Sequence, residues 1–187
     1  MDSHSFISQV GYRGNNGGGN GNGSSNGNGG NHGRNLANVV KKVLVLRVVA
    51  KDSATTATET ELADDIFGAS GDVVNLQSQY KACSYDLLQF NAVTSNTDVG
   101  LDGVYTVNLP NTVVNGAADR TIKEAARDEA TLRLGTLTDI ADHVMVCLPP
   151  GTTGGWIAYA FINHWLSVYN DIWCGYPSAQ IHEIGKS

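Results

Sequence analysis

The 187-residue sequence contains no uninterrupted apolar run long enough to cross a membrane. Its longest apolar-rich stretch, residues 156–173, is broken by Asn163, His164, Asn170 and Asp171. The first residues, MDSHSFISQVGYRG, lack the basic start and apolar core of a secretory signal peptide. We therefore predict neither a membrane span nor a signal peptide in this chain.

Positive charge is also scarce, because 12 Lys and Arg residues face 18 Asp and Glu residues, for a formal net charge of −6. No basic patch or stripe stands out, so nucleic acid is not an expected partner. The three cysteines have no zinc-ribbon or C-x-x-C spacing. Two alternatives stay open for them: a secreted protein with one thiol left unpaired, or an intracellular protein with three buried free thiols. The three are Cys83, Cys147 and Cys174.

A low-complexity segment precedes the part of the chain that can fold. Residues 14–35 are almost entirely Gly, Asn and Ser, which bury little apolar surface and lose much backbone entropy when ordered. We predict that residues 1–39 form a disordered tail or linker and that residues 40–187 form one domain, a partial catalytic domain by the resemblance given below. About 150 residues suffice for a single hydrophobic core.

Hydrophobic periodicity predicts an alternation of strands and helices along the rest of the chain. The expected strands are 41–50, 85–93, 103–109, 143–148, 156–161 and 164–170, and the last two are either strands or one aromatic hairpin. The expected helices are 58–68, 72–83 and 119–135, followed by a helix that starts after Ser178. This order indicates a mixed α/β or α+β layer fold. The family resemblance given below implies a twisted mixed sheet with two to three helices.

Three helix details are specific enough to test. Thr121 and Glu124 form a candidate capping box for the helix 119–135, whose apolar stripe is Ile122, Ala126, Ala130 and Leu134. Ser178, after Pro177, is a candidate N-cap of the last helix. The stripe of the helix 72–83 is Val73, Leu76, Tyr80 and Cys83.

The last eight residues, QIHEIGKS, contain two partial motifs. Gly-Lys-Ser could end a phosphate-binding loop, but that motif needs a glycine where Gln180 stands and a helix after the serine. His182-Glu183 is the first half of H-E-x-x-H, in which two histidines one helical turn apart bind the same zinc ion. Lys186 occupies the place of the second histidine.

Longer stretches resemble the gametolysin family of zinc metallopeptidases. They are KKVLVLRVVAKDS, DDIFG, SQYKACSYDLLQF, ADHVMVCLPPGT, WIAYAFINHWLSVYNDIWC and YPSAQIHEIG, and they cover about residues 40–185. The run from Ala141 to Gly185 is the most specific part of the resemblance. It implies the upper subdomain of a metzincin-like fold that ends in an active-site helix, here cut short.

By this resemblance His182 is the first zinc ligand and Glu183 the general base of a metalloendopeptidase. The family implies zinc as cofactor and extracellular or cell-wall glycoproteins as substrates, which an edge strand within WIAYAF would align. The resemblance predicts an N-terminal portion truncated inside the zinc motif. A catalytic zinc needs about three protein ligands, so we predict that this polypeptide neither holds zinc tightly nor cleaves peptides. The alternative function is a catalytically dead metzincin-like module that binds proteins.

Other side chains have simpler expected roles. We predict that His143 and His164 are structural or exposed, and that Trp156, Trp165 and Trp173 pack rather than form a platform for sugars. Four acidic residues lack the loop spacing of a calcium site, and we interpret them as capping or solvated groups. These are Asp64, Asp65, Asp139 and Asp142.

Overall fold

A computed structural model describes residues 38–96, 98–100, 102–114 and 116–186. The prediction of a tail over residues 1–39 falls almost wholly outside them. Within the described residues the strands are β1 (Val39–Val49), β2 (Leu88–Ala92), β3 (Val104–Asn108), β4 (His143–Leu148), β5 (Ala158–Ala160) and β6 (Leu166–Asn170). The helices are α1 (Glu59–Phe67), α2 (Leu76–Cys83), α3 (Asp119–Leu134), α4 (Leu137–Ile140), the 3-10 helix η1 (Asp171–Gly175) and α5 (Pro177–Ile184).

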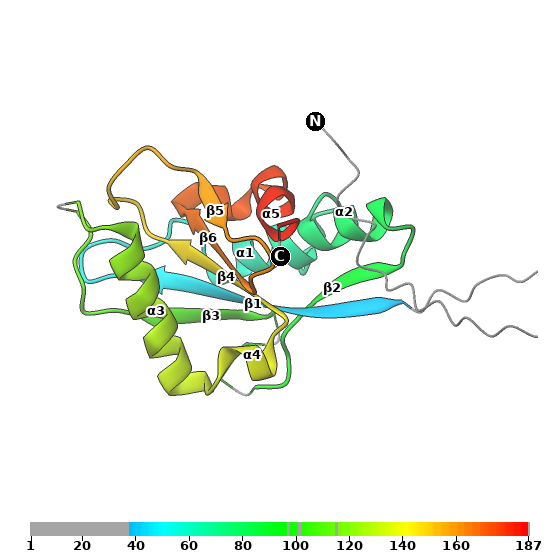
Figure 1. Ribbon diagram of the computed structural model, residues 1–187, viewed down its shortest axis with the longest axis horizontal. Helices are drawn as coiled ribbons and strands as arrows, with labels where there is room; N and C mark the ends of the chain where they lie inside the picture. Colours follow the sequence, from blue (N-terminus) through cyan, green and yellow to red (C-terminus); the bar gives the residue numbers. More distant parts are fainter. Residues whose placement is uncertain (1–37, 97, 101, 115, 187) are drawn as a thin grey trace, which may run out of the picture. The chain divides into compact units, whose positions relative to one another are not determined.

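All described strands belong to one mixed sheet in the order β2-β1-β4-β6-β5, with β3 also paired to β1 (Figure 1). The long β1 pairs with β2 through residues 39–43 and with β3 through residues 45–49. Every pairing is parallel except that of β5 with β6. The mixed α/β class is thus confirmed, as is the hairpin of 156–161 and 164–170, and the described residues contain five α-helices.

The two faces of the sheet are covered by different helices (Figure 1). All six residues of β4 are buried, as expected for a parallel strand with helices on both faces. The predicted stripe of α3 lies in the cluster on one face, with Leu44, Leu46 and Val146 of the sheet. The other face packs α1, α2 and α5 against Val43, Val45 and the remaining sheet residues of the second cluster.

Three helices differ from the sequence predictions in their start or in their N-cap, although α3 begins at Asp119 as predicted. α3 begins after Ala118 without a side-chain cap, and Glu124 bonds Arg120 instead of Thr121, so the predicted capping box is wrong. Tyr176, and not Ser178, is the N-cap of α5, because Pro177 already occupies the first turn, where its missing N–H costs nothing. In both helices the N-cap therefore lies earlier in the sequence than the predicted one.

The third difference concerns α2, which begins at Leu76 and is capped by Asn75 and Ser78 in a reciprocal box. Val73 precedes the helix and is 81% exposed, so it is not part of the apolar stripe. Cys83, at the other end of the predicted stripe, is exposed as well. Leu76 and Tyr80 alone form the buried stripe of α2.

The described residues contain both disulfide-bonded and free cysteines. Cys147 at the end of β4 and Cys174 in η1 form a disulfide across a Cα–Cα distance of 5.6 Å, whereas Cys83 is free and exposed. The alternative of three buried free thiols is therefore wrong. The disulfide attaches the segment that leads into α5 to a central strand of the sheet.

Candidate functional site

The short helix α5 carries the predicted site residues, and it is held by contacts that sequence patterns did not reveal. Gln180 is fully buried and donates from Nε2 to the Cys174 carbonyl at 2.6 Å. Tyr80 of α2 donates from Oη to the Ile181 carbonyl at 3.2 Å. These bonds and the apolar contacts of Ile184 fix the helix against the sheet and α2.

His182 and Glu183 point in different directions, as adjacent residues on a helix must. The His182 side chain is 71% exposed, while that of Glu183 is only 5% exposed. The distance from His182 Nε2 to Glu183 Oε1 is 3.9 Å. The pair is thus close, but the predicted ligand faces solvent and the predicted base lies inside.

Lys186 neutralises the buried carboxylate. Its Nζ lies 2.7 Å from Glu183 Oε2, and its side chain is 32% exposed. A buried carboxylate needs such a partner, because leaving it unpaired in a low-dielectric site is costly. Lys186 and Glu183 are three residues apart, so one helical turn brings them together. The lysine at the expected ligand position therefore forms an ion pair with the predicted base.

A shallow hollow of about 440 Å³ lies beside His182 and Glu183, between α5, η1 and the start of β5. Its wall is mostly apolar or small. The lining residues are Ile157, Ala158, Trp173, Ser178, Ala179, His182 and Glu183. A hollow of this composition suits an apolar side chain next to the His-Glu pair.

The strand β5 forms the edge of the sheet above the hollow. Among the described residues β6 is its one paired strand, with Tyr159 opposite Val168. The opposite edge is different, because Gln77 donates from Nε2 to the Phe90 carbonyl of β2 at 2.8 Å. No strand of the described residues pairs with the outer side of β5, and such a row of backbone groups is a template for one more strand.

His143 lies away from this site, in the core. Its Nε2 is 2.8 Å from Ser167 Oγ, and both residues are buried. Burial, and to a lesser degree the charge of His164, lowers the pKa of His143 to about 4. Its predicted structural role agrees with this geometry. The rings of Trp156 and Trp165 pack against the cluster on the α3 face.

The acidic residues considered for calcium have structural contacts. Asp64 accepts hydrogen bonds from the backbone N–H groups of Ser70 and Asp72, which lower its pKa. Asp142 accepts from Lys42 N and pairs with Lys41. Across the described ranges, no group of three or more His, Cys, Asp or Glu residues could hold a metal ion. No helix in that part of the chain is long and apolar enough to cross a membrane.

The described residues define a mixed α/β domain, with one antiparallel edge strand, a hollow beside that strand and a helix that carries His-Glu. The family model for gametolysin peptidase M11 matches residues 41–184, and the chain belongs to this family. No curated protein and no solved structure matches the chain.

The family implies a metal ion, and the described residues do not fit a catalytic zinc. Such an ion needs about three nitrogen, sulfur or oxygen donors that converge on one point. The His182 side chain instead faces solvent. One carboxylate oxygen of Glu183 is paired with the ammonium group of Lys186. A protonated lysine has no lone pair to offer a metal and repels it by charge.

Proposed function

We propose that this chain supplies the substrate-binding part of a gametolysin-type zinc metalloendopeptidase, and that with its described residues it neither holds zinc tightly nor cleaves peptides. In this proposal His182 is its metal-ligating residue and Glu183 its general base. The observation that carries the proposal is the 2.7 Å contact between Glu183 and Lys186. It supports a site that resembles a peptidase but is blocked at the base.

The block follows from the chemistry of a general base. A carboxylate accepts a proton only through a lone pair that faces the group to be deprotonated. In this chain Glu183 is 5% exposed and its Oε2 already accepts from Lys186. A water molecule at Oε2 therefore competes with a charge-assisted bond, which is among the stronger hydrogen bonds in proteins.

The proposed substrate is an extended peptide segment of an extracellular or cell-wall glycoprotein. The unpaired edge of β5 supports backbone pairing with such a segment, and the apolar hollow supports an apolar side chain beside it. The Cys147–Cys174 disulfide supports an oxidising compartment, where such bonds persist. None of these three features involves nucleic acid, which is not an expected partner.

The alternative function, a protein-binding module without catalysis, shares the β5 edge and the hollow. It is favoured by the same contact of Lys186 with Glu183. The two functions differ in the expected effect of Lys186→His, because only a site that retains peptidase geometry binds a metal when histidine replaces the lysine.

The test is Lys186→His. A histidine there lies four residues after His182, on the same helix face, and it releases Glu183. We expect isothermal titration with Zn²⁺ to detect one weak site, held by the two histidines, in Lys186→His and none in the original chain. Matched controls are Lys186→Ala, which frees Glu183 without adding a ligand, and Lys186→His combined with His182→Ala.

Stoichiometric zinc in the original chain, measured by elemental analysis together with cleavage of a peptide library, contradicts the proposed block. An absence of zinc binding in Lys186→His, in protein that still melts cooperatively, contradicts the role of His182 and favours the binding module. A site that survives His182→Ala places the metal elsewhere. Each result identifies which part of the proposal fails.

A further inference from the structure

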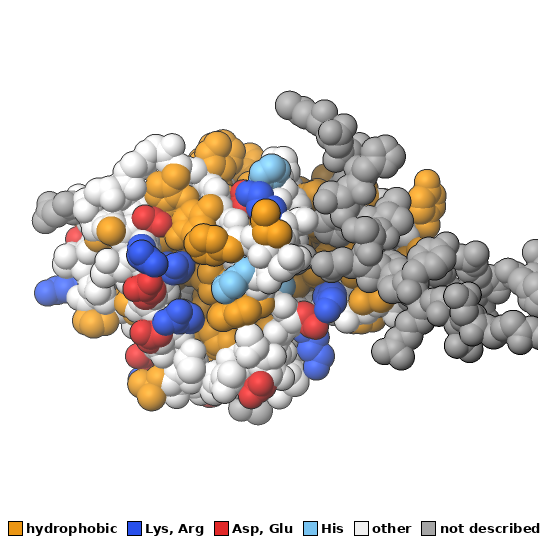
Figure 2. Space-filling model, in the orientation of Figure 1, with side chains coloured by type: hydrophobic (Ala, Val, Ile, Leu, Met, Phe, Trp, Pro, Cys, Tyr) orange, Lys and Arg blue, Asp and Glu red, His pale blue; other side chains and the backbone are white. Residues whose placement is uncertain are grey.

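A run of ring contacts links the β5 edge to the surface on the α3 side of the sheet. Trp156 and Tyr159 have ring centroids 5.5 Å apart, and Tyr159 and Phe161 are 6.2 Å apart. Phe161 is 58% exposed. We call these three residues the aromatic patch. Figure 2 shows hydrophobic surface next to the charged side chains on this face of the molecule.

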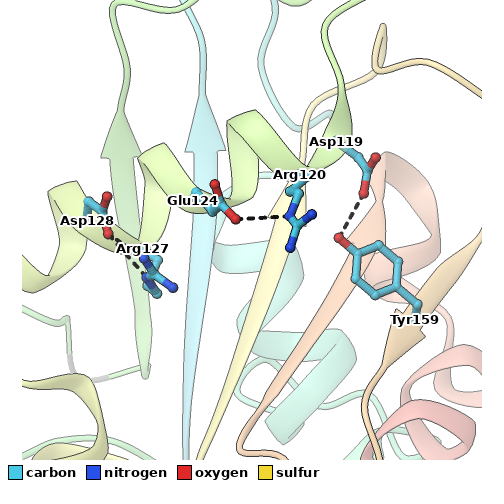
Figure 3. Close-up of polar contacts among 6 residues, drawn as sticks. All are labelled: Asp119, Arg120, Glu124, Arg127, Asp128 and Tyr159. Atoms are coloured by element: carbon cyan, nitrogen blue, oxygen red, sulfur yellow. Dashed lines mark hydrogen bonds and ion pairs between the residues drawn. The ribbon is translucent and has the colours of Figure 1, made fainter.

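Charged groups of α3 border the aromatic patch (Figure 3). Tyr159 donates from Oη to Asp119 Oδ2 at 2.8 Å, a contact between residues 40 positions apart. Arg120 bonds Glu124 at 3.2 Å. Burial is the largest cause that raises the pKa of Tyr159, followed by the hydrogen bond to Asp119 and the negative charge of that residue. The positive charge of Arg120 lowers this pKa, and the negative charge of Glu124 raises it. Two carboxylates and one guanidinium therefore act on the Tyr159 hydroxyl, for a formal net charge of −1.

The pleat of β5 separates this surface from the hollow. Ala158 lines the hollow and packs with the cluster on the α5 face, while Tyr159 packs with the cluster on the α3 face. A peptide paired with β5 has the same alternation. When one of its side chains faces the hollow, the next residue in its sequence faces Tyr159.

We propose that the α3-facing side of the β5 edge, formed by Tyr159, Asp119 and Glu124, is a subsite for a basic side chain of the docked peptide. This inference rests on the peptide docking proposed above. The substrate class is then an extended segment with an apolar residue next to an arginine or lysine, the first facing the hollow and the second facing Tyr159.

Shape and charge both favour a basic side chain of the peptide over a neutral or an acidic one at this position. Side chains of neighbouring strands lie about 5 Å apart, and arginine and lysine are about as long as tyrosine. A basic side chain beside Tyr159 therefore lies along the ring and brings its charge toward Asp119. The cation is attracted by the ring face and by the net negative charge of the border. An acidic side chain meets repulsion from both carboxylates.

The test measures binding by fluorescence anisotropy of short labelled peptides at about pH 8, where histidine is neutral. The peptides share an apolar residue and differ at the next position, which is arginine, its neutral isostere citrulline, or glutamate. We expect arginine to bind about fivefold more tightly than citrulline, and glutamate to bind most weakly. The preference for arginine should decline as salt is raised.

Variants of the chain locate the preference. Asp119→Asn with Glu124→Gln reverses the net charge beside Tyr159 and should abolish the preference. Arg120→Gln removes the opposing cation and should increase it. The matched control is Asp128→Asn with Glu129→Gln, which makes the same charge change further along α3, where these residues pair with Arg127 and Arg133. The control should keep the preference.

Equal binding of the three peptides, with affinity lost when the edge is blocked by Ala160→Pro, overturns the subsite and leaves the docking proposal intact. The register places the N–H of Ala160 on the side of β5 that faces away from β6. A preference that Asp128→Asn with Glu129→Gln also removes is a general charge effect and overturns the subsite too. Absence of binding by every peptide overturns both proposals, as does a second copy of the chain on the edge, seen as a dimer by sedimentation.

Discussion

His143 predicts a pH dependence of stability that does not depend on any function. It is buried against Ser167, and its pKa of about 4 lies below the ordinary value of 6.5. In the folded chain the imidazole therefore stays neutral at pH values where the unfolded chain has already bound a proton. The stabilisation is present above pH 6.5 and is lost as the pH falls toward 4.

The magnitude follows from the two pKa values. Each pH unit between them removes about 1.4 kcal/mol, so the total loss between neutral pH and pH 4 is about 3 kcal/mol. That is a substantial fraction of the free energy of unfolding of an ordinary domain, roughly 5–15 kcal/mol. Carboxylates with lowered pKa values, such as Glu61 and Asp142, add a slope of the same sign at lower pH.

The assay is urea unfolding at a series of pH values for the original chain and for His143→Gln. Glutamine reaches Ser167 as the histidine does but does not titrate in this range. The difference between the two curves removes the slope of the carboxylates. His182→Gln serves as the control for replacing a histidine at the surface, because that side chain is 71% exposed. Equal slopes for the original chain and His143→Gln refute the reasoning.

Three further predictions concern stability. Replacing both bridging cysteines by serine opens a loop with a sequence separation of 27 and should cost about 3–4 kcal/mol in denaturant unfolding, whereas Cys83→Ser, at an exposed free thiol, should be nearly neutral. Thr58→Ala removes the cap of α1 and should cost about 1 kcal/mol, measured as a shift of the unfolding midpoint without a change in slope. Gly103→Ala combines a positive φ of 73° with a Cβ only 2.7 Å from that of Ala92, so we expect a clear drop in Tm; an unchanged Tm contradicts the close approach.

Local patterns predicted much of the fold because they depend only on neighbouring residues. The stripe of α3 recurs at helical spacing, and all of its members are buried. The apolar run of β4 is a buried parallel strand, and the aromatic segments on either side of Asn163 pair as a hairpin. Gly68 ends α1 in a left-handed conformation, which glycine adopts at little cost.

Helix starts were predicted less well, because several side chains near a start can cap it. Thr121 and Glu124 have the spacing of a capping box, yet α3 begins two residues earlier and Glu124 pairs with Arg120. At α2 the box formed by Asn75 and Ser78 determines the start. The competition between such caps is settled by how each helix packs on the sheet.

The sequence by itself determined the elements other than α4 and η1, the mixed α/β class, and the resemblance that assigns the family, because periodicity and long ordered matches are written in consecutive residues. Tertiary structure alone decided that Cys147 pairs with Cys174, that Glu183 is buried while His182 is exposed, and that Tyr159 meets Asp119. These pairings depend on strand register and on how helices pack across the sheet. Such distances in space are fixed only when the whole chain is folded.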